Sequence, residues 1–320
     1  MVEHMRVVRD FQPVTAMHRG HVVAVGNFDG VHRGHQALLR RALDIAKVRR
    51  TGAGVLVFEP HPRVFFRPEE SHFELTPLPR KLELLSGYGM QLAGVLSFNA
   101  ALANQSPEAF VEHALIDWLG VSHVVVGYDF FFGKSRSGTP ELLKSLGLIR
   151  GFGVDVVAPQ AEAGEPFSSS AIRAKLAASD VSGAAHDLGS WWRVTGPVVG
   201  GAQRGGPMGF PTANVVMPKG TSLGHGIFAV RVAVDGGWHS GAAYLGTRPT
   251  FDDGKPVLEV FVFDFAANLY GKSLTVEFID HIRPDRKFDN VDALVAQMEQ
   301  DCARARAILA EAPALPNFTR

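Results

Sequence analysis

Apolar residues in the first half of the chain gather in short runs that are separated by longer, mixed segments. The runs lie at residues 22–25, 54–58, 92–98, 123–127 and 154–158, and each is too short for a buried helix. Two of the mixed segments open on Ser106-Pro107-Glu108 and Thr139-Pro140-Glu141, which are typical helix starts with a capping residue, a proline and an acid. Five strands alternating with helices predict a parallel, doubly wound sheet that binds its ligand outside the carboxyl ends of the strands.

The pattern changes near residue 187, where the alternation of strand and helix ends and Gly and Pro become dense from 196 to 211. Short alternating segments follow at 192–199, 213–217, 226–234, 238–245, 257–263 and 274–282, with a hairpin signal at Asp235-Gly236. Six short antiparallel strands predict a small closed barrel, and residues 291–310 predict a closing helix capped by Asp289 or Asn290. We therefore expect an α/β domain over 1–186 and an all-β domain over 187–320.

Charge and composition restrict the kinds of partner. The 32 basic and 32 acidic residues cancel, so we expect no overall attraction to nucleic acid or to an anionic membrane, and no protein partner is indicated. Cys302 is the only cysteine, which excludes a disulfide within the chain and a cysteine zinc cluster. Residues 1–10 contain no hydrophobic signal core, and no apolar run reaches membrane length. We expect a cytoplasmic protein that binds phosphate through local groups of residues.

The most informative stretch is residues 22–35, where an apolar strand stops at Gly26 and a helix opens over 36–50. Glycines at 26, 30 and 34 allow tight turning and close approach of the backbone to a ligand. His32 and His35 lie at or just before the helix N-terminus, which favours bound anions, so a phosphate is the expected ligand. Two alternatives are an ordinary surface helix start and a zinc site, although no third ligand lies nearby in a zinc-like spacing.

The segment from Gly26 to His35, Gly-Asn-Phe-Asp-Gly-Val-His-Arg-Gly-His, resembles the nucleotidyltransferase signature of bacterial bifunctional FAD synthetases. These enzymes carry riboflavin kinase and FMN adenylyltransferase on one chain, whereas the signature alone indicates only an adenylyltransferase with a His-x-Gly-His motif. The resemblance implies that His32 and His35 stabilise the transition state of adenylyl transfer. It also implies that ATP is bound by Gly26, Asn27, Phe28, Asp29 and Gly34.

Two later segments add candidates to this domain. The strand at 123–127 runs into an aromatic loop with Asp129 at its turn, and we expect about two of Phe130, Phe131 and Phe132 in the core. The serines at 168–170 open a short helix, with Arg173 one turn along the same face. Alone, these residues also fit a packed loop and an ordinary cap. Beside the histidines they resemble two further motifs of the family, which implies that Asp129, Ser169 and Ser170 bind ATP and that Arg173 holds phosphate oxygens.

The expected barrel opens with a glycine-rich segment at residues 200–214. Backbone amides of such a loop, including that of Gly205, can surround a phosphate. Thr212 and Asn214 alternate onto one face, where their oxygens can hold Mg²⁺ and phosphate. The segment matches neither the Walker pattern nor the kinase glycine loop, and its composition alone favours an ordinary flexible connection.

The segment 209–214, Gly-Phe-Pro-Thr-Ala-Asn, closely resembles the riboflavin kinase motif, and the elements at 246–251, 258–261, 269–271 and 286–288 follow in the order of that family. The resemblance covers about residues 15–310. It implies that Thr212 and Asn214 bind Mg²⁺ and ATP phosphates and that Glu259 is the catalytic base. Without it, Glu259 is an outward residue of an alternating strand. Gly206 and Phe261 stand where many relatives have arginine and histidine, and neither is assigned to the chemistry.

Together these resemblances imply a bifunctional enzyme of FAD biosynthesis. The barrel transfers the γ-phosphoryl group of ATP to riboflavin, and the N-terminal domain joins the resulting FMN to a second ATP, releasing pyrophosphate. The expected ligands are riboflavin, FMN, FAD and ATP, with Mg²⁺ as the cofactor. Two other functions remain open: an adenylyltransferase whose barrel only senses flavin, and a flavin-binding module that consumes no ATP.

Overall fold

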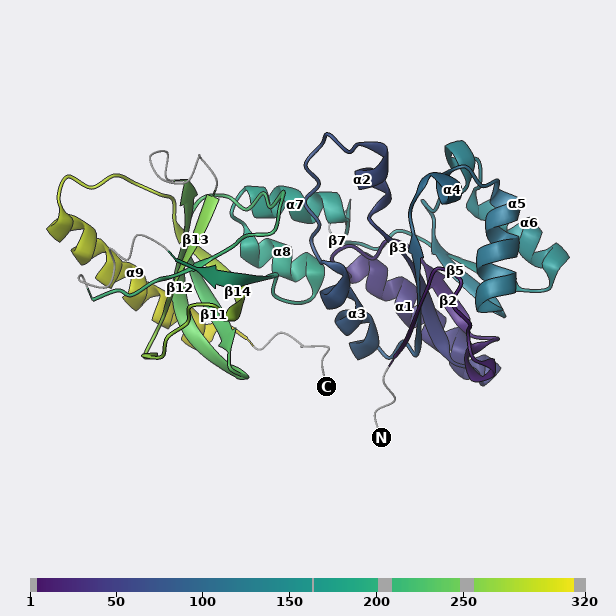
Figure 1. Ribbon diagram of the computed structural model, residues 1–320, viewed down its shortest axis with the longest axis horizontal. Coiled ribbons are helices and arrows are strands. Elements are labelled where there is room, and N and C mark those ends of the chain that lie inside the picture. Colours follow the sequence, from purple (N-terminus) through teal and green to yellow (C-terminus); the bar gives the residue numbers. More distant parts are fainter. Residues whose placement is uncertain (1–4, 163, 201–208, 248–255, 314–320) are drawn as a thin grey trace. The chain divides into compact units, whose positions relative to one another are not determined.

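The computed structural model describes residues 5–162, 164–200, 209–247 and 256–313 (Figure 1). The chain divides into two compact units between Ser169 and Ser170. The division precedes residue 186 because helix α8 (Val181–Leu188) and all but the first residue of α7 (Ser169–Ala177) belong to the second unit. Compactness does not decide where each activity begins, so the functional boundary after residue 186 stays a prediction. Along the described parts of the chain, no helix is long and apolar enough to span a membrane.

The first unit is built on a six-stranded sheet in the order β1-β4-β3-β2-β5-β6, in which every neighbouring pair is parallel. Its strands are β1 (Arg6–Arg9), β2 (Val22–Val25), β3 (Ala53–Glu59), β4 (Leu92–Ser97), β5 (His123–Gly127) and β6 (Gly153–Val157). The predicted parallel sheet is confirmed, with one strand more than expected. The apolar pattern misses β1 because this edge strand has arginines at both ends.

Helices cover both faces of this sheet (Figure 1). Helices α1 (Arg33–Arg49) and α3 (Leu78–Gly87) share one apolar core with Val22 and Ala24 of β2. The other core joins Val23 and Val25 to α5 (Pro107–Phe110), the π-helix η2 (Val111–Leu119) and α6 (Pro140–Arg150). Both predicted helix starts are confirmed, since the side chains of Ser106 and Thr139 cap α5 and α6.

Shorter elements complete the first unit. They are α2 (Pro62–Phe66), α4 (Ala100–Ala103), the 3₁₀ turns η1 (Ala16–His18) and η3 (Lys134–Arg136), and an antiparallel ribbon of β7 (Ala161–Glu162) and β8 (Glu165–Pro166). The prolines at 60 and 62 predict a loop over residues 59–63, but helix α2 begins within this segment, shortly after the carboxyl end of β3. A proline at the first helical position suits such a start, because its missing N–H would have had no partner there.

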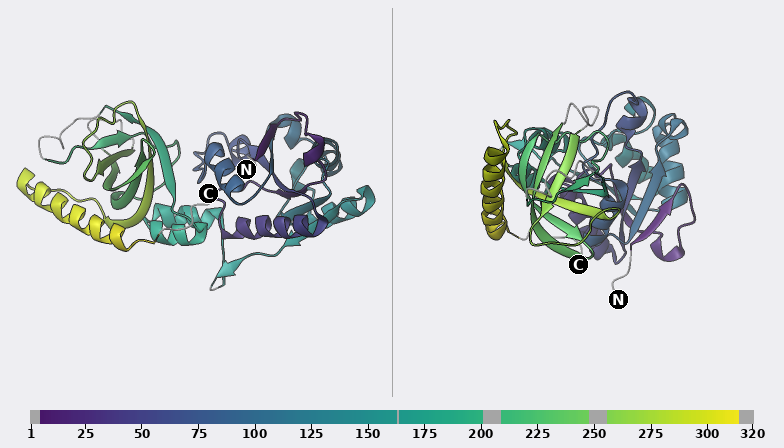
Figure 2. Two further views of the ribbon diagram at one scale, coloured as in Figure 1. Left: turned by 90° about the horizontal axis from the view of Figure 1, so that it is seen from below. Right: turned by 60° about the vertical axis from the view of Figure 1, so that its left-hand side comes forward.

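The second unit contains the predicted six-stranded antiparallel barrel, closed in the order β10-β13-β12-β11-β14-β9. Its strands are β9 (Arg193–Val199), β10 (Ala213–Val215), β11 (Gly226–Val234), β12 (Gly237–Thr247), β13 (Pro256–Val262) and β14 (Ser273–Arg283). Helix α9 (Val291–Glu311) lies along the barrel as expected (Figure 2), and its cap is Asn290, whose Oδ1 accepts the N–H of Ala293 at 2.8 Å.

Alternation along the strands separates the interior of the barrel from its outer face. In β11 the even-numbered residues from Gly226 to Val234 are all buried, whereas Ile227 and Arg231 on the other side are partly exposed. Ala229 interrupts this pattern because it lies in the apolar cluster that joins the barrel to Ala305 and Leu309 of α9. The outward residues that α9 leaves uncovered are therefore the ones available for chemistry.

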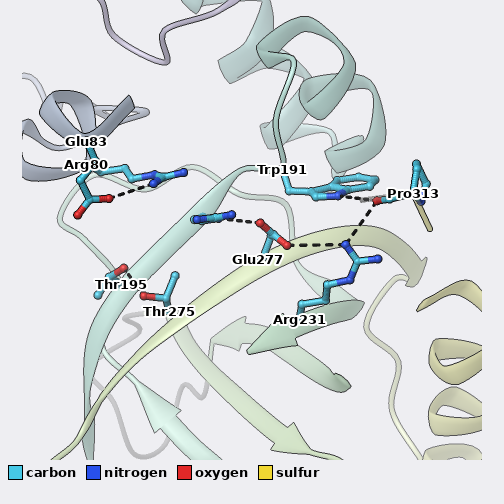
Figure 3. Close-up of polar contacts among 9 residues, drawn as sticks. Arg80, Glu83, Trp191, Thr195, Arg231, Thr275, Glu277 and Pro313 are labelled. Atoms are coloured by element: carbon cyan, nitrogen blue, oxygen red, sulfur yellow. Dashed lines mark hydrogen bonds and ion pairs between the residues drawn. The ribbon is translucent and has the colours of Figure 1, made fainter. Parts of the chain in front are cut away.

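A buried carboxylate on this outer face links three strands. Glu277 of β14 lies opposite Arg193 of β9 and Arg231 of β11. Its Oε1 receives Arg193 Nε at 2.6 Å, and Arg231 Nη1 lies 4.0 Å from its Oε2 (Figure 3). Arg231 and the indole N–H of Trp191 also donate to the carbonyl of Pro313, beyond the end of α9. The cluster therefore ties the barrel to the chain that leaves its closing helix.

Candidate functional site

The turn after β2 is held in an uncommon backbone conformation. Phe28 and Val31 have φ angles of 49° and 45°, a region that non-glycine residues seldom adopt. Both side chains are buried in the core against α1, with exposures of 0% and 1%. Burial of these two side chains compensates for backbone strain of about 1–3 kcal/mol per residue. The turn that was predicted to hold phosphate is therefore rigidly built.

Two hydrogen bonds from distant segments fix Asp29 in this turn. Its Oδ1 accepts the backbone N–H of Thr76 at 3.0 Å, and its side chain is almost fully buried. Its carbonyl oxygen accepts the hydroxyl of Ser169 at 2.9 Å. The structure thus brings the first predicted serine to the histidine motif across 140 residues of sequence. Binding of ATP by Asp29 stays a prediction. The carboxylate of Asp29 also has a structural role, because it accepts the backbone N–H of Thr76.

The two histidines stack on one another at the start of α1. His32 is the N-cap of the helix, and its Nδ1 accepts the backbone N–H of His35 at 3.4 Å. The ring centroids lie 3.7 Å apart at an interplanar angle of 25°. Because Nδ1 of His32 is an acceptor, its proton resides on Nε2 when the ring is neutral. The interpretation as an incidental surface helix start is wrong, since His32 is only 6% exposed.

His35 is electrically neutral in this setting. Burial is the main cause that lowers its pKa well below the ordinary value of 6.5, and His32 and Lys81 lower it further. Its Nδ1 is buried and has no hydrogen-bond partner among the described residues. A neutral imidazole donates one N–H and carries no charge, so His35 would contact a phosphate through a directed hydrogen bond, and that contact stays a prediction. In the described ranges, no group of three or more His, Cys, Asp or Glu is placed to hold a metal, so the zinc alternative has no support.

Gly34 is required by the packing of the pair. A Cβ at this position would lie 3.0 Å from the ring of His32 and 3.2 Å from the carbonyl of Phe167. Both contacts are tighter than ordinary van der Waals distance, so a side chain here would displace the His32 ring. Gly26 and Asn27 occupy the same turn, and the Gly26 N–H donates to the Leu56 carbonyl at 3.1 Å.

The remaining candidates of the first domain lie on later segments, after β5 and on α7. Asp129 is exposed after the carboxyl end of β5, with its carboxylate turned back over Gly127. Phe132 is buried, Phe130 packs on the same core and Phe131 is 44% exposed, which agrees with the expectation of two in three. Ser170 and Arg173 lie on α7, the helix that the serines were predicted to open, and their contact with phosphate stays a prediction.

Sequence reasoning missed an aromatic group at the same edge of the sheet. The rings of Phe65, Phe66 and Phe98 lie 5.2–5.6 Å from one another, and Phe66 is 64% exposed. Tyr128, which follows β5, is 50% exposed. Exposed large aromatics at a ligand-binding edge indicate a surface for a planar apolar group. The signal in the sequence is the pair Phe65-Phe66 shortly after Pro62, which the loop interpretation passed over.

The second group of candidates lies on the outer face of the barrel. Asn214 of β10, Glu259 of β13 and Tyr244 of β12 face one another across neighbouring strands, so their side chains share one side of the sheet. Thr212 precedes β10, and its hydroxyl donates to Oε2 of Glu259 at 3.2 Å. Glu259 thus faces outward, and it contacts Thr212, one of the predicted Mg²⁺ ligands. Gly205 and Gly206 lie outside the described residues.

Polar contacts with α9 and its preceding segment border this group. The hydroxyl of Tyr244 donates to Asp285 at 3.0 Å, and Arg283 at the end of β14 forms a two-pronged ion pair with Asp301 of α9. Tyr244 was not among the predicted residues, although it is an aromatic with a polar tip that follows Ala242 and Ala243 in its strand. Phe261, one of the two departures from the family pattern, packs between the rings of Phe210 and Phe263 at 5.5 and 5.6 Å.

Comparison with known proteins finds a different family match in each half of the chain. The family described as FAD synthetase matches residues 14–171, and the family described as riboflavin kinase matches residues 188–309. A protein of Pseudomonas fluorescens named bifunctional riboflavin kinase/FMN adenylyltransferase is 39% identical over 307 residues, which cover 96% of this chain and 98% of that protein. A protein of the same name from Listeria monocytogenes is 35% identical over 293 residues, covering 91% and 93%.

A solved structure is similar over nearly the whole chain. The crystal structure of a Streptococcus pneumoniae protein named as a macrolide-efflux protein has a TM-score of 0.85 at 29% identity, covering 94% of this chain and 98% of that one.

Proposed function

Because the chain belongs to the family of bifunctional riboflavin kinase/FMN adenylyltransferases, we propose that each of its two activities uses one of the two groups of residues described above. The enzyme phosphorylates riboflavin to FMN with ATP and adenylylates FMN with a second ATP to form FAD. The assignment of residues rests on one observation in each unit. These are the stacked His32–His35 pair at the start of α1 and the Thr212–Glu259 hydrogen bond on the barrel.

In the kinase reaction, Glu259 accepts the proton of the ribityl 5′-hydroxyl as this oxygen attacks the γ-phosphorus of ATP. The carboxylate is half-buried on the outer face of the barrel, so a substrate hydroxyl can reach it. The hydroxyl of Thr212 donates to its Oε2 at 3.2 Å and helps to orient the carboxylate. The remaining catalysis is positioning and neutralisation of phosphate charge, as in phosphoryl transfer generally.

The residues around Glu259 fit a magnesium ion. Mg²⁺ prefers oxygen ligands, and in ATP-dependent enzymes it takes one or two from the protein and the rest from phosphates and water. Thr212 and Asn214 offer a hydroxyl and an amide oxygen from alternate positions of one strand edge, beside the carboxylate of Glu259. These two residues would hold the ion, which supplies neutralisation of phosphate charge when bound.

In the adenylyl transfer, the phosphate of FMN attacks the α-phosphorus of ATP and pyrophosphate leaves. No protein base is needed, because this nucleophile is already ionised near neutral pH. The Nε2–H of His32 and the N–H of the neutral His35 donate to oxygens on which charge develops, and the helix N-terminus adds its partial positive charge. Arg173 supplies a formal positive charge, which the neutral His35 lacks, by spanning two phosphate oxygens.

The exposed aromatic residues provide a place for the flavin in the first unit. Phe66, Phe131 and Tyr128 follow two different strands at the carboxyl edge of the sheet. An isoalloxazine ring is planar and largely apolar, and aromatic side chains stack on such rings.

Since both reactions consume ATP, we place the enzyme in the cytoplasm, where ATP is made available.

The rival in which the barrel only senses flavin predicts Glu259 in a buried salt bridge away from any substrate. Glu259 is half-buried on the outer face and accepts a hydroxyl hydrogen bond, which favours the kinase assignment. A non-enzymatic flavin-binding module is the second rival, and it predicts no consumption of ATP.

Purified protein incubated with riboflavin, ATP and Mg²⁺ separates these functions. Chromatography of timed samples should show FMN first and FAD later, with two ATP consumed and one pyrophosphate released per FAD. Removal of Mg²⁺ with a chelator should stop FMN formation, and added Mg²⁺ should restore it. Flavin binding without turnover would support the binding module, and FAD made only from supplied FMN would support the sensor.

A further inference from the structure

A tyrosine stands beside the proposed base of the kinase. Tyr244 of β12 is the register partner of Glu259 on β13, and Glu259 is also the partner of Asn214 on β10 (Figure 1). Opposite residues of an antiparallel pair place their side chains on the same face, with Cβ atoms about 4.5–5.5 Å apart. The three side chains therefore form one row across neighbouring strands, in the order Asn214, Glu259, Tyr244.

The two ends of this row differ in chemistry. Thr212 and Asn214, at the β10 end, offer the oxygens that were proposed above to hold Mg²⁺ and ATP phosphate. In phosphoryl transfer the attacking and leaving oxygens lie roughly in line, on opposite sides of the phosphorus. With ATP phosphate at the β10 end and Glu259 in the middle, the acceptor alcohol approaches from the β12 end. Tyr244 therefore lies on the side of the acceptor.

The ring of Tyr244 lies along its own strand and is fixed at its tip. A Cβ added at Gly246, two residues further along the same face, would overlap the hydroxyl end of the Tyr244 ring, so a side chain there would displace the phenol. The hydroxyl donates to Oδ2 of Asp285 at 3.0 Å, across 41 residues of sequence. Tyr244 is only partly buried, so a ligand on this face can reach it.

The carboxylate that holds this hydroxyl lies on an anchored segment. Arg283, two residues before Asp285, forms a two-pronged ion pair with Asp301 of α9, and Arg286 donates to Gln297 of the same helix. Asp285 itself is exposed, and water competes for both groups of an exposed hydrogen bond, so its bond to the tyrosine contributes little to stability. The consequence of this bond is geometric, because it fixes the direction of the phenol beside Glu259.

We propose that Tyr244, oriented by Asp285, is a specificity residue of the kinase that contacts the ribityl chain of riboflavin. This chain carries its reacting 5′-hydroxyl to Glu259, so the carbons and hydroxyls next to it pass Tyr244, the neighbouring side chain of the row. A phenol that donates to a carboxylate can also accept a hydrogen bond from a polyol hydroxyl, and its ring offers apolar surface to C–H groups. This inference rests on the kinase function proposed above for Glu259.

The test measures initial rates of FMN formation by the full-length protein, at varied riboflavin and at varied ATP. Tyr244→Phe keeps the ring and removes the hydroxyl. We expect the KM for riboflavin to rise about tenfold in this variant, the scale of losing one hydrogen bond to the substrate. The KM for ATP and kcat should stay at their wild-type values, because a contact made equally in the bound substrate and the transition state affects only the KM of that substrate.

Three further measurements separate contact with the chain from a structural role. Asp285→Ala should raise the KM for riboflavin less than Tyr244→Phe does, and the double variant should not exceed Tyr244→Phe, because Asp285 acts through the tyrosine. Lumichrome, which has the flavin ring without the ribityl chain, should inhibit FMN formation by Tyr244→Phe and by wild type with the same inhibition constant. Asp235→Ala is the matched control, since it removes an exposed carboxylate that pairs with Lys272 on the same barrel, and it should leave both KM values unchanged.

An unchanged KM for riboflavin in Tyr244→Phe would overturn the proposal. A joint loss of affinity for riboflavin, lumichrome and ATP would overturn it as well, because it would make Tyr244 a structural residue. If Tyr244→Phe does not fold, Asp285→Ala changes only an exposed side chain, and an unchanged KM for riboflavin there overturns the inference. Glu259→Ala distinguishes the two levels: normal FMN formation in that variant refutes the proposed kinase site, whereas an inactive Glu259→Ala beside an unchanged Tyr244→Phe refutes only the role of Tyr244.

Discussion

Thr212 and Glu259 share a hydrogen bond of 3.2 Å across 47 residues of sequence, so the hydroxyl assigned to the metal is already held by the carboxylate assigned to the proton. The threonine is the donor in this bond, which leaves its oxygen lone pairs free to face a cation. Thr212 therefore contacts the proposed base and is itself a proposed Mg²⁺ ligand. Removing its hydroxyl should affect both proton transfer and metal binding.

The first prediction concerns Thr212→Val, which keeps the β-branched shape suited to a strand edge and removes only the hydroxyl. Hydrogen bonds to charged groups contribute about 1.5–3 kcal/mol, so we expect riboflavin kinase turnover to fall by about tenfold or more. Higher Mg²⁺ should recover part of the loss, and FAD formation from supplied FMN should continue. Steady-state kinase rates over a Mg²⁺ titration measure this.

Thr195→Val is the matched control, because Thr195 lies on the same barrel and its hydroxyl bonds only to that of Thr275 among the described side-chain contacts, at 2.8 Å. It should leave kinase rates unchanged. Wild-type rates for Thr212→Val at limiting Mg²⁺ would remove Thr212 from the site.

At the scale of single residues, the sequence identifies candidates more readily than their contacts and protonation states. The order of motifs indicates His32, His35, Thr212 and Glu259, because each lies in a segment that resembles a motif of the family. It does not indicate that the histidines stack or that His35 is neutral, since both depend on burial by distant segments.

Among the structural elements, the strands of the barrel are joined on their outer face by the ions around Glu277. This side chain is about 5% exposed, and Arg193 is about 12% exposed, so neither is well screened by solvent. Arg193 also stacks over Trp238, with its guanidinium carbon 5.0 Å from the ring centroid. Arg231 links these ions to the chain after α9, because its guanidinium donates to the carbonyls of Ala312 and Pro313.

The second prediction is that Glu277→Gln destabilises the barrel strongly. Breaking a buried pair by removing one partner leaves an uncompensated charge, which costs about 3–5 kcal/mol. Thermal or denaturant unfolding of the second unit should register the change. Asp264→Asn is the matched control, because Asp264 pairs with Arg306 in an exposed setting and its loss should hardly change the unfolding midpoint. Equal stability of Glu277→Gln and wild type would show that the arginines do not need this carboxylate.

Most elements could be predicted because their periodicity agrees with their environment. The barrel strands alternate since only one face of each is buried, and the central strands of the sheet are continuously apolar since both faces are covered. β1 could not be predicted, because pairing with β4 gives an arginine-flanked edge segment its conformation. The short helix α2 was missed for a different reason, since prolines near a strand end indicate a loop as readily as a helix start.

At the scale of the whole molecule, the chain has two units with separate cores, and we propose that the His32–His35 pair of the first and Glu259 of the second serve different reactions. Helices α7 and α8 belong to the second unit, and α8 packs against β14 of the barrel. Asp187 of α8 is buried, and its Oδ2 receives Lys175 Nζ of α7 at 2.7 Å. A cut at the expected boundary after residue 186 would therefore divide a packed helical segment.

The third prediction compares two fragments, one from Ser170 and one from Asp187, both ending at Arg320. Each should convert riboflavin to FMN and make no FAD. The longer one should melt at the higher temperature, because it keeps α8 and the Lys175–Asp187 pair. A well-folded fragment without kinase activity, or one that makes FAD, would contradict the separation of the two sites.

The central claim is that one chain carries two independent sites, and it is tested most directly by comparing His35→Ala with Glu259→Ala in full-length protein. With riboflavin, ATP and Mg²⁺, His35→Ala should make FMN at the normal rate and FAD about 10² times more slowly, the scale of losing one transition-state donor. Glu259→Ala should make almost no FMN from riboflavin but should convert supplied FMN to FAD normally. Equal losses of both reactions in either variant would contradict the account, because they would indicate one shared site or a common folding defect.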